Sequence, residues 1–407
     1  MLCASGVKPV VSRRESEVVR TQVGIVGAGP AGLVLAHLLG LQGIESVVLE
    51  ARDREYVQQR VRAGVLEQNT VDLLRAAGVA ERLDREGIVH HGIELRFDGE
   101  GHRIPMSDLT GGRAIWIYGQ QEVVKDLIAA REVAGVPPVF EVSDVAVHEI
   151  DGDAPFITYK TVDGAAERLD CDVIAGCDGF HGICRPAIGA ERLQIAEREY
   201  PFGWLGILAD VAPSTDELIY AYHDRGFAMH SLRSPTLSRL YLQVDPSDDI
   251  NNWSDQRIWE ELHLRFEAPG WSLTEGPIIE KGITPMRSFV AAPMRRGRLF
   301  LAGDAAHIVP PTGAKGLNLA VNDVRVLAEA LESYYATGST TGLDEYSDTC
   351  LARVWRVQDF STYMTTLLHR HSGDPFDSGL QRARLRYVTT SEASARSLAE
   401  NYVGLPT

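Results

Sequence analysis

Residues 23–41 constrain the fold of this chain more than any other segment. Residues 23–26 are a short apolar run typical of a buried strand, and Gly27, Gly29 and Gly32 follow it at the start of an apolar-periodic helix. In this spacing the first glycine permits a tight turn, the second lets a pyrophosphate approach the backbone, and the third lets the helix pack closely. The segment predicts a Rossmann-like dinucleotide-binding unit and an α/β fold.

Three carboxylates reinforce this prediction. Glu50 lies 18 residues after Gly32, at the end of the second strand-like run, where such units bind a ribose diol. Asp178 and Asp304 also follow buried strand-like runs and stand beside glycines. The three acids predict one large nucleotide site, and the alternative for Asp304 is that it caps a helix.

The pattern changes along the chain. Residues 51–85 and 345–400 read as largely helical, whereas 218–222, 227–232 and 239–244 are strand-like runs separated by short turns, which predicts an antiparallel sheet. The predicted organisation is an N-terminal extension at 1–20, the dinucleotide-binding domain at 21–195, an inserted antiparallel β-sheet substrate domain at 196–290, and a return to the first domain with a helical C-terminal region at 291–407.

Composition restricts the function. The 407 residues include 56 acidic and 40 basic side chains, and the net charge of −16 disfavours nucleic acid or an anionic membrane surface as a partner. No apolar run approaches the roughly 18 residues that span a bilayer. The five cysteines have no paired spacing for zinc. We expect a cytoplasmic protein with no metal site.

Three motifs together resemble the class A flavoprotein aromatic monooxygenases: the glycine motif at 27–32, Asp178-Gly179, and Gly303-Asp-Ala-Ala-His307. Four further segments look like the branch of this family that acts on 4-hydroxybenzoate: 60–68, 200–206, 307–318 and 400–406. The likeness runs from about Thr21 to the end. It implies an FAD-binding domain and a homodimer.

The resemblance also implies a reaction. NAD(P)H would reduce FAD, O2 would form a flavin C4a-hydroperoxide, and 4-hydroxybenzoate would be hydroxylated at C3 to give 3,4-dihydroxybenzoate. Two alternatives stay open. One is a related flavin hydroxylase for another hydroxylated aromatic acid, because a few pocket changes alter the substrate. The other is a flavin- or aromatic-acid-binding sensor without turnover.

By resemblance, the substrate carboxylate is bound by Ser231, Arg233 and Tyr241. Strand alternation places Ser231 and Arg233 on one face, as a carboxylate clamp requires. Tyr220 matches the tyrosine that hydrogen-bonds the substrate hydroxyl, and the backbone carbonyl of Pro311 lies beside that hydroxyl. Without the resemblance, the favoured interpretation of Ser231 and Arg233 is that they are solvated strand residues.

Tyr402 and His90 match the remaining positions of a proton relay, Tyr402 as the partner of Tyr220 and His90 as the link to solvent. A hydroxyl chain ending in imidazole moves a proton near neutral pH, and a phenolate is a better carbon nucleophile than a phenol. The alternatives without a role in catalysis are that Tyr402 is a packing tyrosine and that His90 is a surface histidine.

The resemblance also assigns the cofactor contacts. Those for FAD are Gly27, Gly29, Gly32, Glu50, Arg60, Arg62, Gln120, Asp178, Asp304, Gly316, Leu317 and Asn318. Those for the nicotinamide cofactor are Arg52, Tyr56, His181 and Arg287, while Arg60, Arg239 and Lys315 match positions used for flavin movement or nicotinamide handling. NADPH-preferring members carry arginine directly after the ribose-binding glutamate, and Ala51 stands there. A missing guanidinium removes a partner for the 2′-phosphate, which favours NADH.

Overall fold

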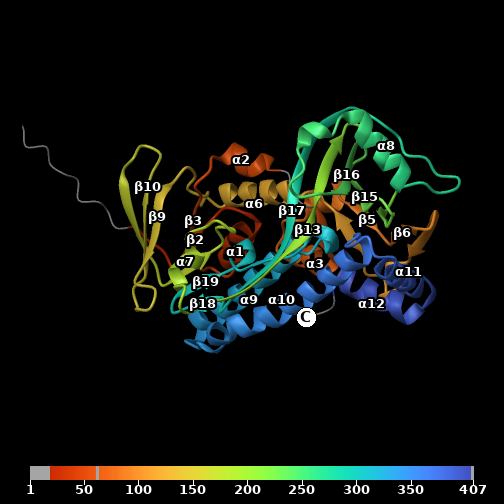
Figure 1. Cartoon of the computed structure of the whole chain (residues 1–407). Coiled ribbons are helices and arrows are strands. Elements are labelled where there is room, and N and C mark those ends of the chain that lie inside the picture. The colour runs from red at the N-terminus through yellow and green to blue at the C-terminus, as the bar shows by residue number, and fades with distance from the viewer. Residues whose placement is uncertain (1–18, 61–63, 405–407) are drawn as a thin grey trace, which may run out of the picture.

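The computed structural model describes residues 19–60 and 64–404 (Figure 1). Its α-helices are α1 (Pro30–Leu41), α2 (Arg54–Gln59), α3 (Gln68–Ala76), α4 (Glu81–Glu86), α5 (Met106–Leu109), α6 (Gln120–Val133), α7 (Cys184–Ile188), α8 (Asp255–Arg265), α9 (Gly316–Thr337), α10 (Thr341–Leu368), α11 (Pro375–Thr390) and α12 (Glu392–Val403). Short 3-10 helices are η1 (Ile250–Asn252), η2 (Gly303–Ala305) and η3 (Pro311–Gly313).

The strands are β1 (Val19–Arg20), β2 (Val23–Val26), β3 (Ser46–Leu49), β4 (Val65–Glu67), β5 (Ile88–His90), β6 (Ile93–Phe97), β7 (Glu100–Ile104), β8 (Ile115–Ile117), β9 (Ser143–His148), β10 (Phe156–Lys160), β11 (Ala166–Asp170), β12 (Val173–Gly176), β13 (Gln194–Ala209), β14 (Leu218–Ala221), β15 (Ala228–Ser234), β16 (Leu237–Val244), β17 (Ile278–Ala292), β18 (Arg295–Arg296), β19 (Leu299–Leu301) and β20 (His307–Ile308). They form sheets of four, five, eight and three strands.

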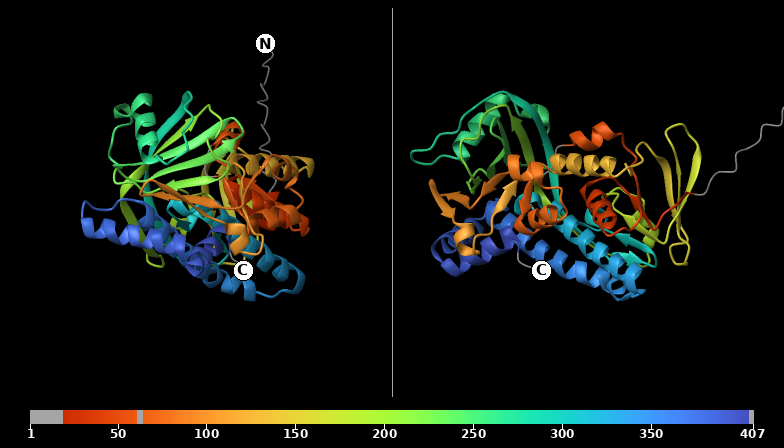
Figure 2. Two further views of the ribbon diagram at one scale, coloured as in Figure 1. Left: turned by 90° about the vertical axis from the view of Figure 1, so that its right-hand side faces the viewer. Right: turned by 180° about the vertical axis from the view of Figure 1, so that it is seen from behind.

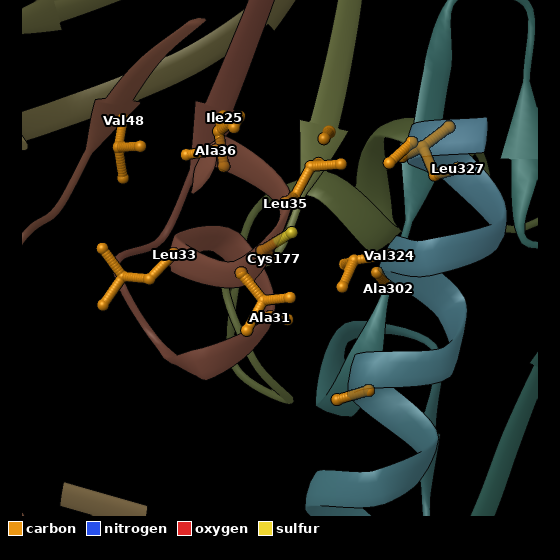
Figure 3. Close-up of a cluster of buried hydrophobic side chains, with 14 of the residues drawn as sticks. Ile25, Ala31, Leu33, Leu35, Ala36, Val48, Cys177, Ala302, Val324 and Leu327 are labelled. Carbon is orange, nitrogen blue, oxygen red and sulfur yellow. The ribbon is translucent and has the colours of Figure 1, made fainter. Parts of the chain in front are cut away.

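The five-stranded sheet has the order β18-β19-β12-β2-β3, and its last four strands are parallel. Every residue of β2 and β12 is buried, as expected for strands covered on both faces. Helix α1 packs against this sheet and against α9, and Figure 3 shows Leu35 of α1 and Val324 of α9 in the shared core. The α/β prediction is confirmed.

The eight-stranded sheet has the order β20-β17-β13-β16-β15-β14-β6-β7. The predicted strands 218–222, 227–232 and 239–244 are its strands β14, β15 and β16. Alternate residues divide between two cores: Leu240 and Leu242 pack in the core that contains α8, whereas Tyr220, Met229 and Trp204 pack in the core that contains α12. The C-terminal helices therefore cover one face of this sheet (Figures 1 and 2).

This sheet is not confined to residues 196–290. Strands β6 and β7 come from residues 93–104, and β20 comes from the loop after β19. Strands β13 and β17 pair along nearly their whole length, from Gln194 opposite Ala292 to Ala209 opposite Ile278. This ladder runs from the region of the five-stranded sheet into the larger one (Figure 1).

One predicted helical stretch is wrong. Val65 and Leu66, which fit a helical period, form strand β4, and the helix starts only at Gln68. Val65 pairs with Ile117 of β8, and β8 also pairs with β5. The cross-strand partners lie about 50 residues away in sequence, so a local period could not reveal them.

No helix within residues 19–60 and 64–404 combines the length and the apolar character that a membrane span requires.

Candidate functional site

The carboxyl ends of β2, β3, β12 and β19 meet at one edge of the five-stranded sheet, because these strands are parallel. The glycine motif turns tightly there. Gly27 has a φ of +105°, and a Cβ on it would lie 2.4 Å from the carbonyl oxygen of Cys177. A Cβ on Gly32 would lie 2.0 Å from the carbonyl oxygen of Gly27, whereas one on Gly29 would meet no atom within 4 Å. Gly29 therefore faces open space that a ligand can use.

The carboxylate of Glu50 fastens this loop to the end of β3. Its Oε2 accepts a hydrogen bond from the backbone N of Ala28 at 2.8 Å, and its Oε1 accepts one from the backbone N of Arg52 at 2.8 Å. Glu50 thus fixes the backbone that leads into α1, and the N-terminus of this helix points its free amides toward the open side.

The other two acids have different surroundings. Asp178 is largely buried, and its Oδ2 accepts from the backbone N of Cys184 at 2.9 Å, while its Oδ1 has no hydrogen-bond partner among residues 19–60 and 64–404. Burial raises the pKa of Asp178. Asp304 is exposed and lies inside η2, whose N-cap is Ala302, so Asp304 is not the capping residue of this helix. Both acids lie at the sheet edge that the sequence predicted.

A second helix begins at the same edge. A Cβ on Gly316, the first residue of α9, would meet no atom within 4 Å. The side chain of Asn318 is used within the protein: its Oδ1 accepts from the backbone N of Glu67 and its Nδ2 donates to the carbonyl of Val65. Two helix N-termini and two open glycines fit a dinucleotide cofactor with a pyrophosphate.

The other predicted cofactor residues are less informative. Leu317 is buried in the first turn of α9, and the half-buried Gln120 begins α6. Arg62 lies outside the described residues.

The guanidinium of Arg233 lies against the segment before β4. A Cβ on Gly64 would come within 2.4 Å of its Nη1, so Gly64 leaves the room that Arg233 occupies. Burial lowers the pKa of Arg233. The pairing of β15 with β16 shifts between Leu232 and Ser234, so Arg233 lies at an irregularity that the predicted alternation did not include.

The two other predicted carboxylate contacts lie on the same pair of strands. Ser231 is buried and stands opposite Arg239. Tyr241 packs its ring 4.7 Å from that of Trp204, and its hydroxyl accepts a hydrogen bond from Nε of Arg239 at 3.4 Å. With Ser231 buried, the alternative of a solvated strand serine does not hold.

The two predicted relay tyrosines meet in the core. Tyr220 and Tyr402 are 182 residues apart in sequence, yet their hydroxyls share a hydrogen bond. The hydroxyl of Tyr220 also donates to the carbonyl of Thr312 at 3.2 Å, whereas Pro311, the residue that the resemblance indicated, is exposed. Burial raises the pKa of both tyrosines, so both are neutral hydroxyls near pH 7.

His90 is placed differently. It is fully buried at the end of β5, so it is not a surface histidine, and burial lowers its pKa to about 4. Neither ring nitrogen has a hydrogen-bond partner within the described ranges 19–60 and 64–404. The structure therefore shows no direct hydrogen bond between His90 and the tyrosine pair.

A buried charge cluster supports Tyr402. Lys315 Nζ donates to the carbonyl of Tyr402 at 2.8 Å and to Oε1 of Glu67 at 2.6 Å, and Arg353 Nη2 donates to Oε2 of Glu67 at 3.0 Å. Burial lowers the pKa of Lys315, and Glu67 opposes this shift. Glu67 and Arg353 could not be predicted from the sequence, because nothing in their local patterns distinguishes them from ordinary helix-surface charges.

The predicted nicotinamide residues form two clusters. Arg52 and Arg60 lie over the ring of Tyr56, at 5.2 and 5.8 Å from its centroid. His181 packs edge-on against Phe180, and Arg287 lies 5.1 Å from the same ring while pairing with Glu197. Arg52, Tyr56 and His181 are exposed, so both clusters are accessible from solvent.

Comparison with known proteins agrees with this geometry. Residues 20–361 match the family model described as FAD binding domain. A protein from Acinetobacter baylyi named p-hydroxybenzoate hydroxylase is 50% identical over 392 residues, which cover 96% of each chain. A para-nitrophenol 4-monooxygenase from a Pseudomonas species is 28% identical over 79% of this chain and 81% of its own.

Among solved structures, p-nitrophenol 4-monooxygenase from Pseudomonas putida has the same fold, with a TM-score of 0.82 and 22% identity over 96% of this chain and 100% of that one. The glycine loop, the two open helix N-termini and these likenesses identify an FAD-dependent monooxygenase. The chain belongs to the class A flavoprotein aromatic hydroxylases, the family of p-hydroxybenzoate hydroxylase.

Proposed function

We propose that this enzyme hydroxylates 4-hydroxybenzoate at C3, using NAD(P)H and O2, to give 3,4-dihydroxybenzoate and water. One observation carries the proposal: the guanidinium of Arg233 and the buried hydroxyl of Tyr220 lie on the paired strands β15 and β14, and Tyr402 of α12 contacts that hydroxyl. Tyr220 pairs with Met229, and Arg233 lies four residues further along β15, about 13 Å of strand.

Each end of this site has a distinct role. Arg233, with Ser231 and Tyr241, orients the carboxylate, because a guanidinium binds both carboxylate oxygens. At the other end, the substrate hydroxyl gives its proton to the oxygen of Tyr220, Tyr220 turns its own proton from the Thr312 carbonyl to the oxygen of Tyr402, and Tyr402 releases its proton toward solvent. The resulting phenolate is activated at the carbon next to it.

The cofactor and the residues around the tyrosine pair supply the rest of the proposed chemistry. Bound FAD, once reduced by NAD(P)H, supplies the activated oxygen. Lys315, held at the carbonyl of Tyr402, contributes positive potential near the phenolate. Tyr220 and Tyr402 are each 1% exposed, so bulk water does not compete at the reacting end of the substrate.

The direct test is oxidation of NADH and of NADPH by the FAD-loaded protein, with and without 4-hydroxybenzoate, with chromatographic assay for 3,4-dihydroxybenzoate. Substrate-stimulated oxidation with a matching amount of product is expected. Stimulation without product would point to another hydroxylated aromatic acid, and no stimulation would favour the sensor alternative.

Tyr220→Phe removes the hydroxyl that takes the substrate proton. Hydroxylation is expected to slow about 100-fold or more, the range of a lost proton-transfer group, and reduced flavin is expected to yield hydrogen peroxide instead. Product formed per NAD(P)H oxidised measures this effect. An unchanged ratio would remove Tyr220 from the relay, and Tyr222→Phe on the same hairpin is the matched control.

Ala51→Arg restores a guanidinium directly after Glu50. Ala51 is exposed at the start of the segment that leads to Arg52 and Tyr56, so the added arginine is free to reach a 2′-phosphate. The ratio of kcat/KM for NADPH to that for NADH is expected to rise about tenfold, the effect of one exposed charge-assisted contact. An unchanged ratio would show that preference is set elsewhere.

Two further proposals concern the whole chain. A homodimer is supported by the resemblance alone, and sedimentation velocity should give about twice 44.6 kDa. A cytoplasmic location is supported by Cys171, Cys177, Cys184 and Cys350, which are buried free thiols.

A further inference from the structure

His369 is a fully buried histidine at the C-terminal end of α10, and the chemistry proposed above does not use it. Its Nδ1 lies 3.0 Å from the carbonyl oxygen of Thr365, and its Nε2 lies 2.6 Å from the indole nitrogen of Trp204. Because the carbonyl only accepts and the indole only donates, the imidazole carries its proton on Nδ1. Burial lowers the pKa of His369 to about 3, so the ring stays neutral near pH 7.

This imidazole belongs to a stack of aromatic rings that reaches the carboxylate end of the proposed site. Phe202 and Phe227 stack on it, with ring centroids 4.6 and 4.3 Å away. The ring of Trp204 lies 4.7 Å from that of Tyr241, which is proposed to bind the substrate carboxylate. Rotation of the buried indole would break its hydrogen bond to His369, which is costly. His369 therefore fixes the ring against which Tyr241 packs.

The same turn of α10 reaches the hydroxyl end of the proposed site. The hydroxyl of Thr365 shares a hydrogen bond of 3.0 Å with the hydroxyl of Thr312, and both residues are fully buried. The carbonyl of Thr312 accepts the hydrogen bond of the Tyr220 hydroxyl. Thr365 thus holds the acceptor on which the Tyr220 proton rests before transfer.

We propose that His369 is a positioning residue, which holds the carboxylate end of the substrate site in place through Trp204. One turn earlier, Thr365 does the same for the hydroxyl end through Thr312. These roles rest on the proposed function for the identity of the substrate, whereas the hydrogen bonds themselves do not. Loss of the bond to Trp204 should weaken substrate binding, and loss of the bond to Thr312 should impair proton transfer from bound substrate.

His369→Asn and His369→Gln separate the two hydrogen bonds of the imidazole. The shorter asparagine keeps a donor near the Thr365 carbonyl but not an acceptor for Trp204, whereas glutamine extends an oxygen toward the indole. His369→Asn is expected to weaken binding of 4-hydroxybenzoate about tenfold, the effect of one buried hydrogen bond left unmade. His369→Gln should restore most of this affinity, and FAD affinity should not change in either variant. His371→Asn, at an exposed histidine that bonds the carbonyl of Thr366, is the matched control.

The indole N–H of Trp204 gives a second readout that needs no substrate. Its resonance in a proton–nitrogen correlation spectrum, assigned by its loss in Trp204→Phe, should shift in His369→Asn and not in His371→Asn. Trp204→Phe should weaken substrate binding by a factor similar to that of His369→Asn. Combining the two changes should weaken binding by less than about twofold more, because both remove one interaction. Fully multiplicative effects, or an unshifted resonance, would overturn the role of His369.

Thr365→Val tests the bond at the hydroxyl end. It should leave the dissociation constant of 4-hydroxybenzoate unchanged and lower the product formed per NAD(P)H oxidised at least about twofold, because the acceptor of Tyr220 is held less firmly. Thr389→Val, whose hydroxyl donates to the carbonyl of Leu385 within α11, is the matched control. An unchanged product ratio would remove Thr365 from this role.

The same measurements separate this role from the proposed function. A near-normal dissociation constant in His369→Asn, with product still formed, would contradict the role of His369 alone. Wild type that binds 4-hydroxybenzoate without hydroxylating it would contradict the proposed function alone, and wild type that does not bind it would contradict both. Loss of the folded state in His369→Asn, together with unchanged substrate binding in Trp204→Phe, would show that His369 only stabilises the core.

Discussion

Arg233→Ala is expected to weaken binding of 4-hydroxybenzoate about 100- to 1,000-fold while FAD stays bound. Losing one partner of a desolvated charge pair costs roughly 3–5 kcal/mol, because the substrate carboxylate is then buried without a counter-charge. Arg233 is half-buried, and this burial lowers its pKa. Perturbation of the flavin absorbance on titration with substrate gives the dissociation constant.

Two further variants sharpen this test. Arg257→Ala removes an exposed guanidinium that stacks on Trp253 of the same inserted segment, and substrate binding should not change. Gly64→Ala places a methyl group 2.4 Å from the present position of the Arg233 Nη1 and should weaken binding with Arg233 still in the chain. A near-normal dissociation constant in Arg233→Ala would exclude it as the carboxylate partner.

Gly29→Val is expected to abolish FAD binding without unfolding the protein. A Cβ on Gly29 meets no protein atom within 4 Å, so the apoprotein can accommodate the side chain, but the added methyl groups fill the space in which the pyrophosphate approaches the backbone. The expected loss of FAD affinity is more than about 100-fold. FAD titration followed by flavin fluorescence and thermal unfolding of the apoprotein give the two readouts.

Other glycines of the same segment provide the controls. Gly32→Ala should destabilise the apoprotein itself, because the new Cβ would lie 2.0 Å from the Gly27 carbonyl. Gly40→Ala, at an exposed position of α1 with no atom within 4 Å, should leave FAD affinity unchanged and stabilise the helix by about 0.5–1 kcal/mol. If Gly29→Val retained its flavin, the pyrophosphate could not lie over this loop.

The cofactor edge could be predicted from the residues themselves. A buried strand, three spaced glycines and Glu50 are close in sequence, and the parallel strands bring Asp178 and Asp304 to the same edge. The substrate site could not be predicted in this way. Tyr220 and Tyr402 meet only because α12 packs on the eight-stranded sheet, and their pairing was available only through resemblance.

The residues that were missed depend on contacts distant in sequence. Glu67 lies 248 residues from Lys315 and 286 from Arg353, and it stands in a run that read as helical until the pairing of β4 was known. Gly64 has no distinctive local pattern, and only its contact with Arg233 shows why a side chain is excluded there. The burial of Glu67 and the space that Gly64 leaves for Arg233 exist only in the assembled fold, so local sequence patterns could not predict them.

Because strands β6, β7 and β20 complete the eight-stranded sheet from outside residues 196–290, we expect the enzyme to unfold as a single cooperative unit. Cutting the chain at 195 and 290 would sever the ladder formed by β13 and β17 near one end, and the excised segment would lack its neighbours β6 and β7. Such a fragment should not fold alone, and denaturant unfolding of the whole protein should show one transition by both flavin and tryptophan fluorescence. A chimaera that takes its substrate-binding segment from a relative would therefore have to include residues 93–104 of that relative together with the inserted strands.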